Sequence, residues 1–240
     1  MTSLRSAIHV HSAWSYDAKV SLEGLADAFA GHGYQVVFMC EHDRGFSQER
    51  WDEYKQACEA ASRPDVLLVP GIEYADPEDR VHIPVWGCAD FLGEALPTTE
   101  LLRRAGGGGG FAVLAHPARR DAWDVVDPAW YTRLGGIEVW TRKWDGWAPN
   151  LRASAVAEEE GLVPIVSLDL HRLNQFFPLA ITISVDGAPS PATALAALRA
   201  ADAKPVLRGL AVGKLSRRPV GDVLTRVERL RRPVVRLIRP

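Results

Sequence analysis

The stretch Ile8-His9-Val10-His11-Ser12 lies near the N-terminus, where a short apolar run leads into two histidines separated by one residue. In a β-strand, residues i and i+2 point to the same side of the sheet. Both imidazole rings are therefore expected to reach one point, as two ligands of a single metal ion do. The pair alone is weak evidence, because seven histidines in 240 residues often produce this spacing by chance.

Length and composition are those of a globular domain. The chain has 240 residues, of which 47% are hydrophobic and 24% are charged, so it can bury a sizeable core. A net charge of -2 does not mark the whole molecule as a nucleic-acid binder. Cys40, Cys58 and Cys88 lack a C-x-x-C spacing and favour a reducing compartment. Without a signal-like or membrane-spanning apolar run, we expect a cytoplasmic protein that does not contact membranes.

Apolar runs and helical spacings alternate along the chain. After the N-terminal strand, we expect further strands at 35–40, 66–69, 81–87, 111–115, 136–140, 163–167 and 180–185. Helices are expected at 22–30, 48–61, 98–104, 151–160 and 191–201, with Ser21 as the N-cap of the first. We interpret 106–110 as a flexible connector, 119–133 as irregular and 141–147 as a loop. The alternation indicates an α/β fold with a largely parallel sheet.

The residues that could bind a metal recur at one place in this pattern, the end of a strand. At or just past the C-terminal ends of expected strands lie His9, His11, His42, Glu73, His116, Asp169 and His171. In a parallel α/β barrel, active sites assemble at that face. Mixed imidazole and carboxylate ligands suit Zn, Mn or Fe. The absence of cysteine from the set argues against a closed structural zinc site.

Taken together, these segments resemble the motifs of the PHP (polymerase and histidinol phosphatase) family. The matching segments are His9-x-His11 with Asp17 six residues later, Cys40-Glu41-His42-Asp43, Gly71-Ile72-Glu73, His82 to Gly87, Ala115-His116-Pro117, Gly136 to Val139 and Ser167-Leu168-Asp169-Leu170-His171. Three departures stand out. Glu41 occupies the usual threonine position, Pro84 is unusual after His82, and one extra residue separates Ser167 from Asp169.

The resemblance implies a distorted (β/α)7 TIM-like barrel over residues 1–203 and a site with two or three divalent metal ions, either Zn, Mn or Fe. The implied ligands are His9, His11, Glu73 and Asp169 for one metal, Glu73, His82 and His116 for a second, and Asp17, His42 and His171 for a third. Glu73 would bridge two metals, because a carboxylate has two oxygens that can span about 3.5–4 Å. Glu73, His116 and Asp169 are the implied catalytic residues.

The expected activity is hydrolysis of a phosphate monoester of a small metabolite, by a hydroxide held between the metals. Such a substrate needs cationic side chains, and Arg119 and Arg142 follow expected strands on the same face. Three alternatives stay open. They are a nuclease or nucleotide phosphatase, a hydrolase of a non-phosphate bond such as an amide, and a non-catalytic metal-binding module. The sequence leaves the substrate, the metal and the oligomeric state open.

The last 37 residues, 204–240, differ in composition from the rest. They hold eleven Lys or Arg residues against Asp222 and Glu228, so residues 1–203 carry a net charge of about -11. We interpret this segment as a basic extension that packs on the same domain. A helix at about 220–231 would bury the apolar stripe of Val223, Leu224, Val227 and Leu230. The alternative is a surface for phosphate or nucleic acid.

Overall fold

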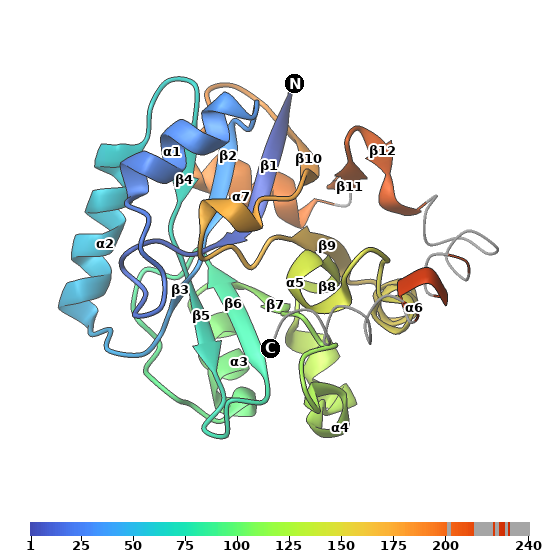
Figure 1. The fold of residues 1–240 in the computed structure, drawn as a ribbon. Coiled ribbons are helices and arrows are strands. Elements are labelled where there is room, and N and C mark those ends of the chain that lie inside the picture. The colour runs from blue at the N-terminus through green and yellow to red at the C-terminus, as the bar shows by residue number, and fades with distance from the viewer. Residues whose placement is uncertain (201–202, 214–222, 224–225, 229, 231–240) are drawn as a thin grey trace.

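Two six-stranded sheets form the centre of the structure (Figure 1). This computed structural model describes all residues except 201–202, 214–222, 224–225, 229 and 231–240. The first sheet has the order β12-β11-β10-β1-β2-β4, with strands Leu210–Ala211, Lys204–Leu207, Leu179–Val185, Thr2–Val10, Val36–Met39 and Leu67–Val69. The second has the order β3-β5-β6-β7-β8-β9, with strands Glu41–His42, Gly71–Ala75, His82–Trp86, Phe111–Leu114, Gly136–Thr141 and Val163–Ser167.

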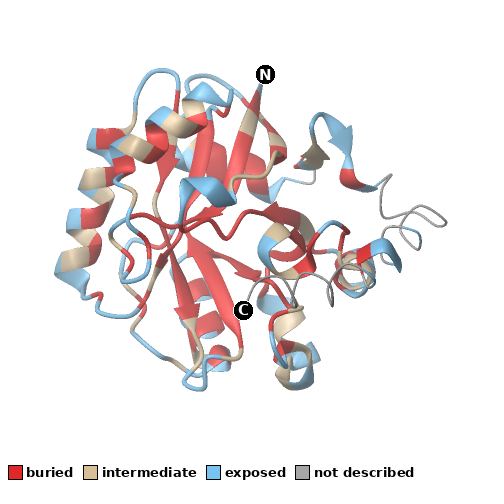
Figure 2. Ribbon diagram, viewed as in Figure 1, coloured by how far each residue is buried: buried red, intermediate tan, exposed pale blue. Residues whose placement is uncertain are grey.

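Helices pack on the outside of these sheets. Figure 2 shows that the central strands are mostly buried, while the helices are exposed on the faces that point away from the sheets. The helices are α1 (Leu22–Gly31), α2 (Gln48–Ala61), α3 (Thr98–Gly107), α4 (Ala122–Val125), α5 (Arg142–Asp145), α6 (Leu151–Glu159) and α7 (Pro191–Arg199), with 3-10 turns η1 (Pro128–Arg133) and η2 (Leu173–Gln175). Ser21 caps α1 as expected, since its hydroxyl accepts a hydrogen bond from the Gly24 N–H at 3.1 Å.

The two sheets meet where strands of one continue into strands of the other. β2 passes through Cys40 into β3, and β4 passes through Pro70 into β5. On the other side, the chain after β9 runs beside the end of β1. There the His11 N–H donates to the Leu170 carbonyl at 2.9 Å, and the Leu168 N–H donates to the Ile8 carbonyl at 3.1 Å. The ends of strands from both sheets are thereby brought to one region.

The structure corrects the expected sheet. Of the ten neighbouring strand pairs described, five are parallel and five are antiparallel, so a largely parallel sheet is wrong. The strand β6 runs antiparallel to both β5 and β7, and β10 runs antiparallel to β1. The described strands pair as two sheets, and the seven-stranded (β/α)7 barrel is not confirmed. Hydrophobic runs specify that a strand is buried but not its direction, which pairing with distant strands decides.

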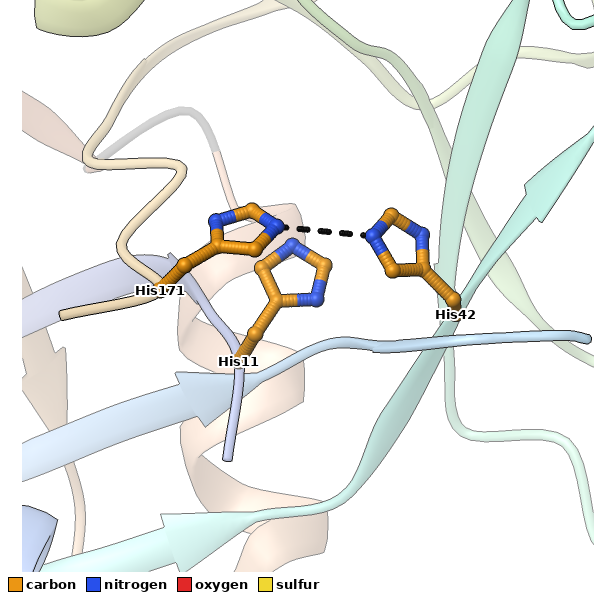
Figure 3. Close-up of side chains that lie close together, drawn as sticks. All are labelled: His11, His42 and His171. Atoms are coloured by element: carbon orange, nitrogen blue, oxygen red, sulfur yellow. Dashed lines mark hydrogen bonds between the residues drawn. The ribbon is translucent and has the colours of Figure 1, made fainter. Parts of the chain in front are cut away.

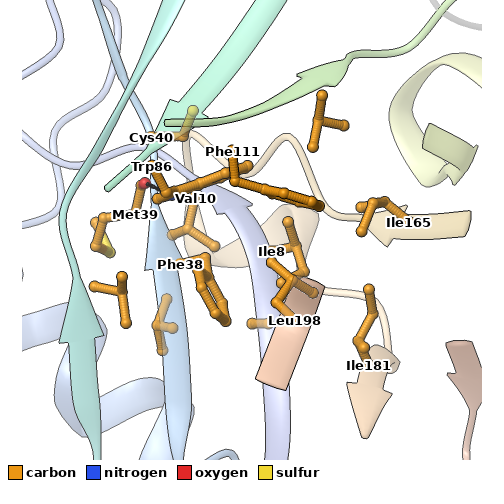
Figure 4. Packing of buried hydrophobic residues seen from close by; sticks show 14 of the residues in the cluster. Ile8, Val10, Phe38, Met39, Cys40, Trp86, Phe111, Ile165, Ile181 and Leu198 are labelled. Atoms are coloured by element: carbon orange, nitrogen blue, oxygen red, sulfur yellow. Dashed lines mark hydrogen bonds between the residues drawn. The ribbon is translucent and has the colours of Figure 1, made fainter. Parts of the chain in front are cut away.

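The core between the sheets and helices is apolar and closely packed (Figure 4). Trp86 of β6 is fully buried, and its indole N–H donates to the Met39 carbonyl at 2.7 Å. The Trp86 ring also meets Phe38 edge to face, with the ring centroids 5.8 Å apart. Gly71, at the start of β5, lies directly against this ring, and a Cβ atom there would overlap the indole. A glycine at this position therefore lets the Trp86 ring lie over β5 and reach the Met39 carbonyl of the first sheet.

Three segments that we expected to be irregular contain helical residues. Helix α3 continues through Gly106 and Gly107, the expected connector. The stretch 119–133 contains α4 and η1, and the expected loop after β8 contains α5. In α5, the Asp145 carboxylate accepts a hydrogen bond from the Thr141 N–H at 2.7 Å. A helix of four residues is too short to show helical periodicity, so the sequence pattern does not predict it.

Residues 204–211 add two strands to the edge of the first sheet, with β11 antiparallel to β10 and β12 antiparallel to β11. Most of the helix expected at 220–231, Leu224 included, lies outside the described residues. At the described positions of its apolar stripe, Val223, Val227 and Leu230 are exposed, so the expected packing of these side chains is wrong. Glu228 is buried instead, because its carboxylate accepts a hydrogen bond from the Trp147 N–H at 3.1 Å.

All three cysteines are buried and unpaired, which agrees with the absence of a disulfide framework. Among the described helices, none combines the length and the apolar character needed to cross a bilayer.

Replacement of Gly71 by alanine should destabilise the fold, because the new methyl group would displace the buried Trp86 ring and would lie 2.8 Å from the Met39 carbonyl oxygen. We expect a loss of about 1–3 kcal/mol in the free energy of unfolding, measured by urea denaturation. The matched control is Gly106→Ala, where no atom lies within 4 Å of the added Cβ. This helical position should be neutral or gain about 0.5–1 kcal/mol. Equal stabilities would contradict the close packing at the junction.

Candidate metal centre

The Glu73 carboxylate lies at the centre of the region where the strand ends meet. Its side chain is almost completely buried. Five imidazole rings lie within ion-pair distance of its oxygens, with nearest nitrogen to oxygen distances of 3.3 Å for His9, 3.5 Å for His11, 3.1 Å for His42, 2.9 Å for His82 and 3.0 Å for His116. These residues come from β1, β3, β5, β6 and the segment after β7, so tertiary packing of both sheets assembles the group.

The two N-terminal histidines converge, but not through the regular alternation of a strand. His9 has a φ of 65°, and the pairing of β1 with β2 shifts register between Ile8 and Val10. This bulge turns His9 out of the regular strand pattern, and His11 follows the end of the strand. The two ring centroids lie 5.1 Å apart. The prediction that both rings reach one point holds, while the predicted geometry of a regular strand is wrong.

Positive φ angles recur at other residues of the centre. His116 has a φ of 25° and Asp169 a φ of 46°, in a region that residues other than glycine seldom occupy. Each such residue costs about 1–3 kcal/mol and persists only where surrounding contacts hold it. For His116, one such contact is the hydrogen bond that its N–H donates to Glu138 at 2.7 Å. Three of the seven described non-glycine residues with a positive φ, namely His9, His116 and Asp169, thus belong to the centre.

Outer hydrogen bonds fix the orientation of three imidazole rings. The Nδ1 atom of His9 lies 2.7 Å from the buried Glu138 carboxylate, and Nδ1 of His11 lies 3.3 Å from the Ser15 hydroxyl. In His171, Nδ1 lies 3.1 Å from the backbone carbonyl of Asp169. When Nδ1 donates to the outer acceptor, Nε2 is the nitrogen that faces the centre and can bind a cation once it is deprotonated. Histidines that bind metals are commonly held in this way.

Glu41, which replaces the usual threonine of the resembled motif, holds the loop that carries His11. Its buried carboxylate accepts hydrogen bonds from the Ser12 hydroxyl at 2.7 Å, the Ser15 hydroxyl at 2.6 Å and the Tyr54 hydroxyl at 3.2 Å. The Ser12 N–H donates to both carboxylate oxygens. Burial raises the pKa of Glu41, although these hydrogen bonds oppose the shift. Its role is to position the loop, and it does not lie among the inward-facing donors.

A second group of donors lies beside the first, where His11, His42 and His171 face one another (Figure 3). The Nε2 atoms of His42 and His171 are 3.4 Å apart, and the rings of His11 and His171 stack with centroids 4.1 Å apart. Asp17 is exposed, and its carboxylate reaches both His42, at 3.4 Å, and His171, at 3.1 Å. Two nitrogens at this separation need a shared proton or a bound cation between them.

His82 opens β6 rather than closing a strand. Because β6 is antiparallel to β5, its first residue pairs with Ala75 at the end of β5. The ring is held on both sides, with Nδ1 2.9 Å from Glu73 and Nε2 2.7 Å from Asp79. Asp79 also pairs with Arg119 at 2.7 Å. Arg119, an expected substrate ligand, is buried and engaged by this acidic residue.

Asp169 faces the centre from the segment after β9. Its Oδ1 atom lies 3.6 Å from Nε2 of His11 and 4.0 Å from Nε2 of His9. Its Oδ2 atom accepts a hydrogen bond from the Trp144 indole at 2.7 Å and pairs with Lys143 at 2.9 Å.

Arg142, the second expected substrate ligand, lies on the same short helix, α5, as Lys143 and Trp144. Its guanidinium lies over the Phe177 ring, with the guanidinium carbon 5.3 Å from the ring centroid. The structure therefore places Arg142 near the centre but not in it.

The donor set fits divalent cations. In the described chain, three groups of donor atoms lie within 4.8 Å of one another, and all of their members are buried. The groups are His11, His42 and His171; His9, Glu73 and His116; and His9, His11 and Asp169. Nε2 of His9, Nε2 of His11 and Oε2 of Glu73 are buried without a hydrogen-bond partner. Buried polar atoms are normally satisfied, and these three form no hydrogen bond, although Oε2 of Glu73 lies 3.1 Å from Nδ1 of His42, so they are well placed to bind a cation.

The pKa shifts of the metal-free chain also indicate that the carboxylates of the centre require positive charge nearby. Burial lowers the pKa of His9, but Glu73 and Glu138 outweigh burial and place it well above the ordinary value. Burial likewise opposes protonation of His42, yet Asp17 and Glu73 raise its pKa to about 10. For Glu73, burial raises the pKa, and the surrounding histidines bring it well below the usual range. Without a metal, protons on His9, His42 and His82 therefore balance the carboxylates, whereas burial lowers the pKa of His11 and His116 and favours their neutral form.

Sequence reasoning found the residues that face the centre but missed those that hold them. The missed residues are Glu41 and Glu138 behind the ligands, and Asp79, Lys143 and Trp144 at the rim. Glu138 had a usable signal, because it lies in the Gly136 to Val139 segment of the resembled family. The pairing of Asp79 with Arg119, 40 residues away, had no local signal.

Replacement of Glu138 by glutamine should weaken metal binding by about 10–100-fold, because the neutral amide no longer holds the His9 ring as a charged acceptor. Isothermal titration of zinc into the metal-depleted protein measures the change. The control is Glu159→Gln, the same replacement on the exposed end of α6. Unchanged zinc affinity in a folded Glu138→Gln variant would remove the positioning role of Glu138.

Comparison with known proteins gives a likeness of fold. No family model matches the chain, and none of the curated protein sequences does. A two-domain protein from Bacteroides vulgatus with a predicted PHP-like metal-dependent phosphoesterase superposes with a TM-score of 0.69 at 19% identity, covering 86% of this chain. The chain spans 65% of the length of that protein.

Two further structures share the fold. PsfC from Pseudomonas syringae superposes with a TM-score of 0.65 at 16% identity, covering 96% of this chain and 99% of its own. A lesion-specific endonuclease from Pyrococcus furiosus superposes with a TM-score of 0.59 at 13% identity, covering 82% of this chain and 55% of its own. The chain thus has a mixed α/β fold shared with a PHP-like protein and with these two structures.

Proposed function

We propose that the protein is a metal-dependent phosphoesterase of the PHP type that hydrolyses a phosphate monoester of a small metabolite. The observation that carries the proposal is the buried convergence of Nε2 of His9, Nε2 of His11 and Oε2 of Glu73, all without hydrogen-bond partners. The fold shared with a predicted PHP-like metal-dependent phosphoesterase supports it. When bound, divalent cations such as Zn, Mn or Fe supply an activated water and offset charge that develops on the phosphate.

Nine side chains are the proposed ligands of two or three metal ions: His9, His11, Asp17, His42, Glu73, His82, His116, Asp169 and His171. Glu73 is the proposed bridge, because each of its two oxygens faces different histidines. In the proposed catalytic set, Glu73, His116 and Asp169 would hold the cations, and the bound cations would supply positive charge for the reacting phosphate. Asp17, which is the most exposed of the nine, faces the side from which a substrate can enter.

The amino acids around the ligands keep these donors in their reactive state. Glu138 holds His9 with Nδ1 protonated, so Nε2 is available as a ligand. The Ser15 hydroxyl does the same for His11, and its own position is fixed by Glu41. Trp144 donates to Asp169 and so orients its second oxygen toward the histidines. A cluster held on both sides in this way needs little reorganisation when substrate binds.

A second candidate function is cleavage of a nucleic acid. The shared fold includes a lesion-specific endonuclease, and the same chemistry at a metal centre can act on phosphodiesters. The basic residues of 204–240 would then contact the strand, and affinity for an oligonucleotide would fall steeply with salt. A screen of phosphorylated metabolites and single-stranded oligonucleotides, after elemental analysis and restoration of each metal, separates the two candidates.

Replacement of Glu73 by glutamine should lower turnover at least about 100-fold, because the amide cannot bridge cations or balance their charge. The readout is kcat on the best ester found in the screen, together with metal content per chain and circular dichroism. Glu158→Gln, on the exposed face of α6, is the control and should keep full activity. Unchanged turnover in a folded Glu73→Gln variant would exclude Glu73 as the bridging ligand.

A further inference from the structure

A polar pocket with three cationic side chains lies beside the metal centre. This basic pocket has a volume of about 470 Å³, and it is lined by Arg142, Lys143, Leu168, Arg172, Asn174, Gln175, Phe176 and Phe177. The lining comes from two segments, helix α5 after β8 and the stretch around η2 after β9. No acidic side chain is among the lining residues, in a domain whose residues 1–203 carry a net charge of about -11.

The basic pocket is next to the proposed ligands along the chain and in space. Leu168 immediately precedes Asp169, and Arg172 immediately follows His171. Lys143 joins the two directly, because its ammonium lies 2.9 Å from Oδ2 of Asp169. A group bound in the pocket would therefore belong to the same substrate as a phosphate held at the centre.

The segment that carries Arg172 is held in place. The Gln175 side-chain oxygen accepts hydrogen bonds from the N–H groups of His171, at 2.7 Å, and Arg172, at 2.9 Å. Phe176 stacks on His32 of the loop after α1, with ring centroids 4.0 Å apart. The Arg172 side chain is exposed, and no carboxylate of the described chain forms an ion pair with it. By contrast, Arg119 on the other side of the centre is already paired with Asp79.

We propose that the basic pocket binds a second phosphate group of the substrate, next to the phosphate that is cleaved. This inference rests on the proposed function and narrows its substrate to esters with two neighbouring phosphates. Arg172 and Arg142 offer planar guanidinium groups, which suit phosphate oxygens, and Lys143 adds a point charge between pocket and centre. The second phosphate comes either from a small bisphosphate or from the next position of a nucleic-acid strand.

The first test measures binding without catalysis. Inorganic pyrophosphate is titrated into the full chain after metal removal, so that the metals do not contribute. The Arg172→Gln variant should bind pyrophosphate at least about tenfold more weakly than the unmodified protein, since a charge-assisted hydrogen bond is lost. Arg103→Gln is the control, because Arg103 is exposed on α3 and pairs only with Glu100 among the described residues. Equal affinity of Arg172→Gln and the unmodified protein would overturn the proposal.

The second test uses the metal-loaded protein and two matched esters. For 2,3-bisphosphoglycerate, whose two phosphates are on adjacent carbons, Arg172→Gln should raise KM about tenfold, while KM for 3-phosphoglycerate should stay unchanged. An equal change for both esters would overturn the proposal. A parallel titration with a short single-stranded oligonucleotide identifies the source of the second phosphate, because the ligand that loses affinity in Arg172→Gln is the one the pocket serves. If no ester is hydrolysed but pyrophosphate binding depends on Arg172, the proposed function fails and the pocket assignment stands.

Discussion

The structure depends on the burial of the Glu73 carboxylate among five histidines. An ionised carboxylate removed from water costs several kcal/mol unless opposite charge surrounds it. Here the rings of His9, His42 and His82 supply that charge as protonated imidazoles in the metal-free chain, and cations bound by the surrounding nitrogens would supply it in a metal-loaded protein. Because the partners come from both sheets, the fold and the site form together. A chain that loses one partner leaves charge unbalanced at the place where the sheets meet.

Two further buried acids explain how the rings keep their orientation. Glu138 lies behind His9 and His116, and Glu41 lies behind the loop that carries His11. Each accepts several hydrogen bonds, which offsets the cost of its burial. With Glu73 and Asp169, the centre therefore contains more buried negative charge than neutral histidines can balance. This excess is the physical reason that the site favours divalent cations over a neutral hydrogen-bonded core.

The rim of the centre is asymmetric. On the side of the β5–β6 turn, Asp79 pairs with Arg119 and with His82, so these cationic groups are held by the protein itself. On the side of α5 and η2, Lys143 pairs with Asp169, while Arg172 lines the basic pocket and forms no ion pair among the described residues. Under the proposed function, a phosphate ester would therefore find an unpaired guanidinium on one side of the centre and the paired guanidinium of Arg119 on the other.

The sequence by itself determined the local features: the helix Gln48–Ala61, the cap at Ser21, and the set of histidines and acids that meet in the centre. Short spacings such as His9-x-His11 and Asp169-x-His171 carry this information, because residues two apart share one segment. Only the tertiary structure decided the antiparallel direction of β6, the bulge at His9 and the capture of Arg119 by Asp79. Each depends on contacts between segments far apart in the chain, and periodicity within one segment does not specify its distant neighbours.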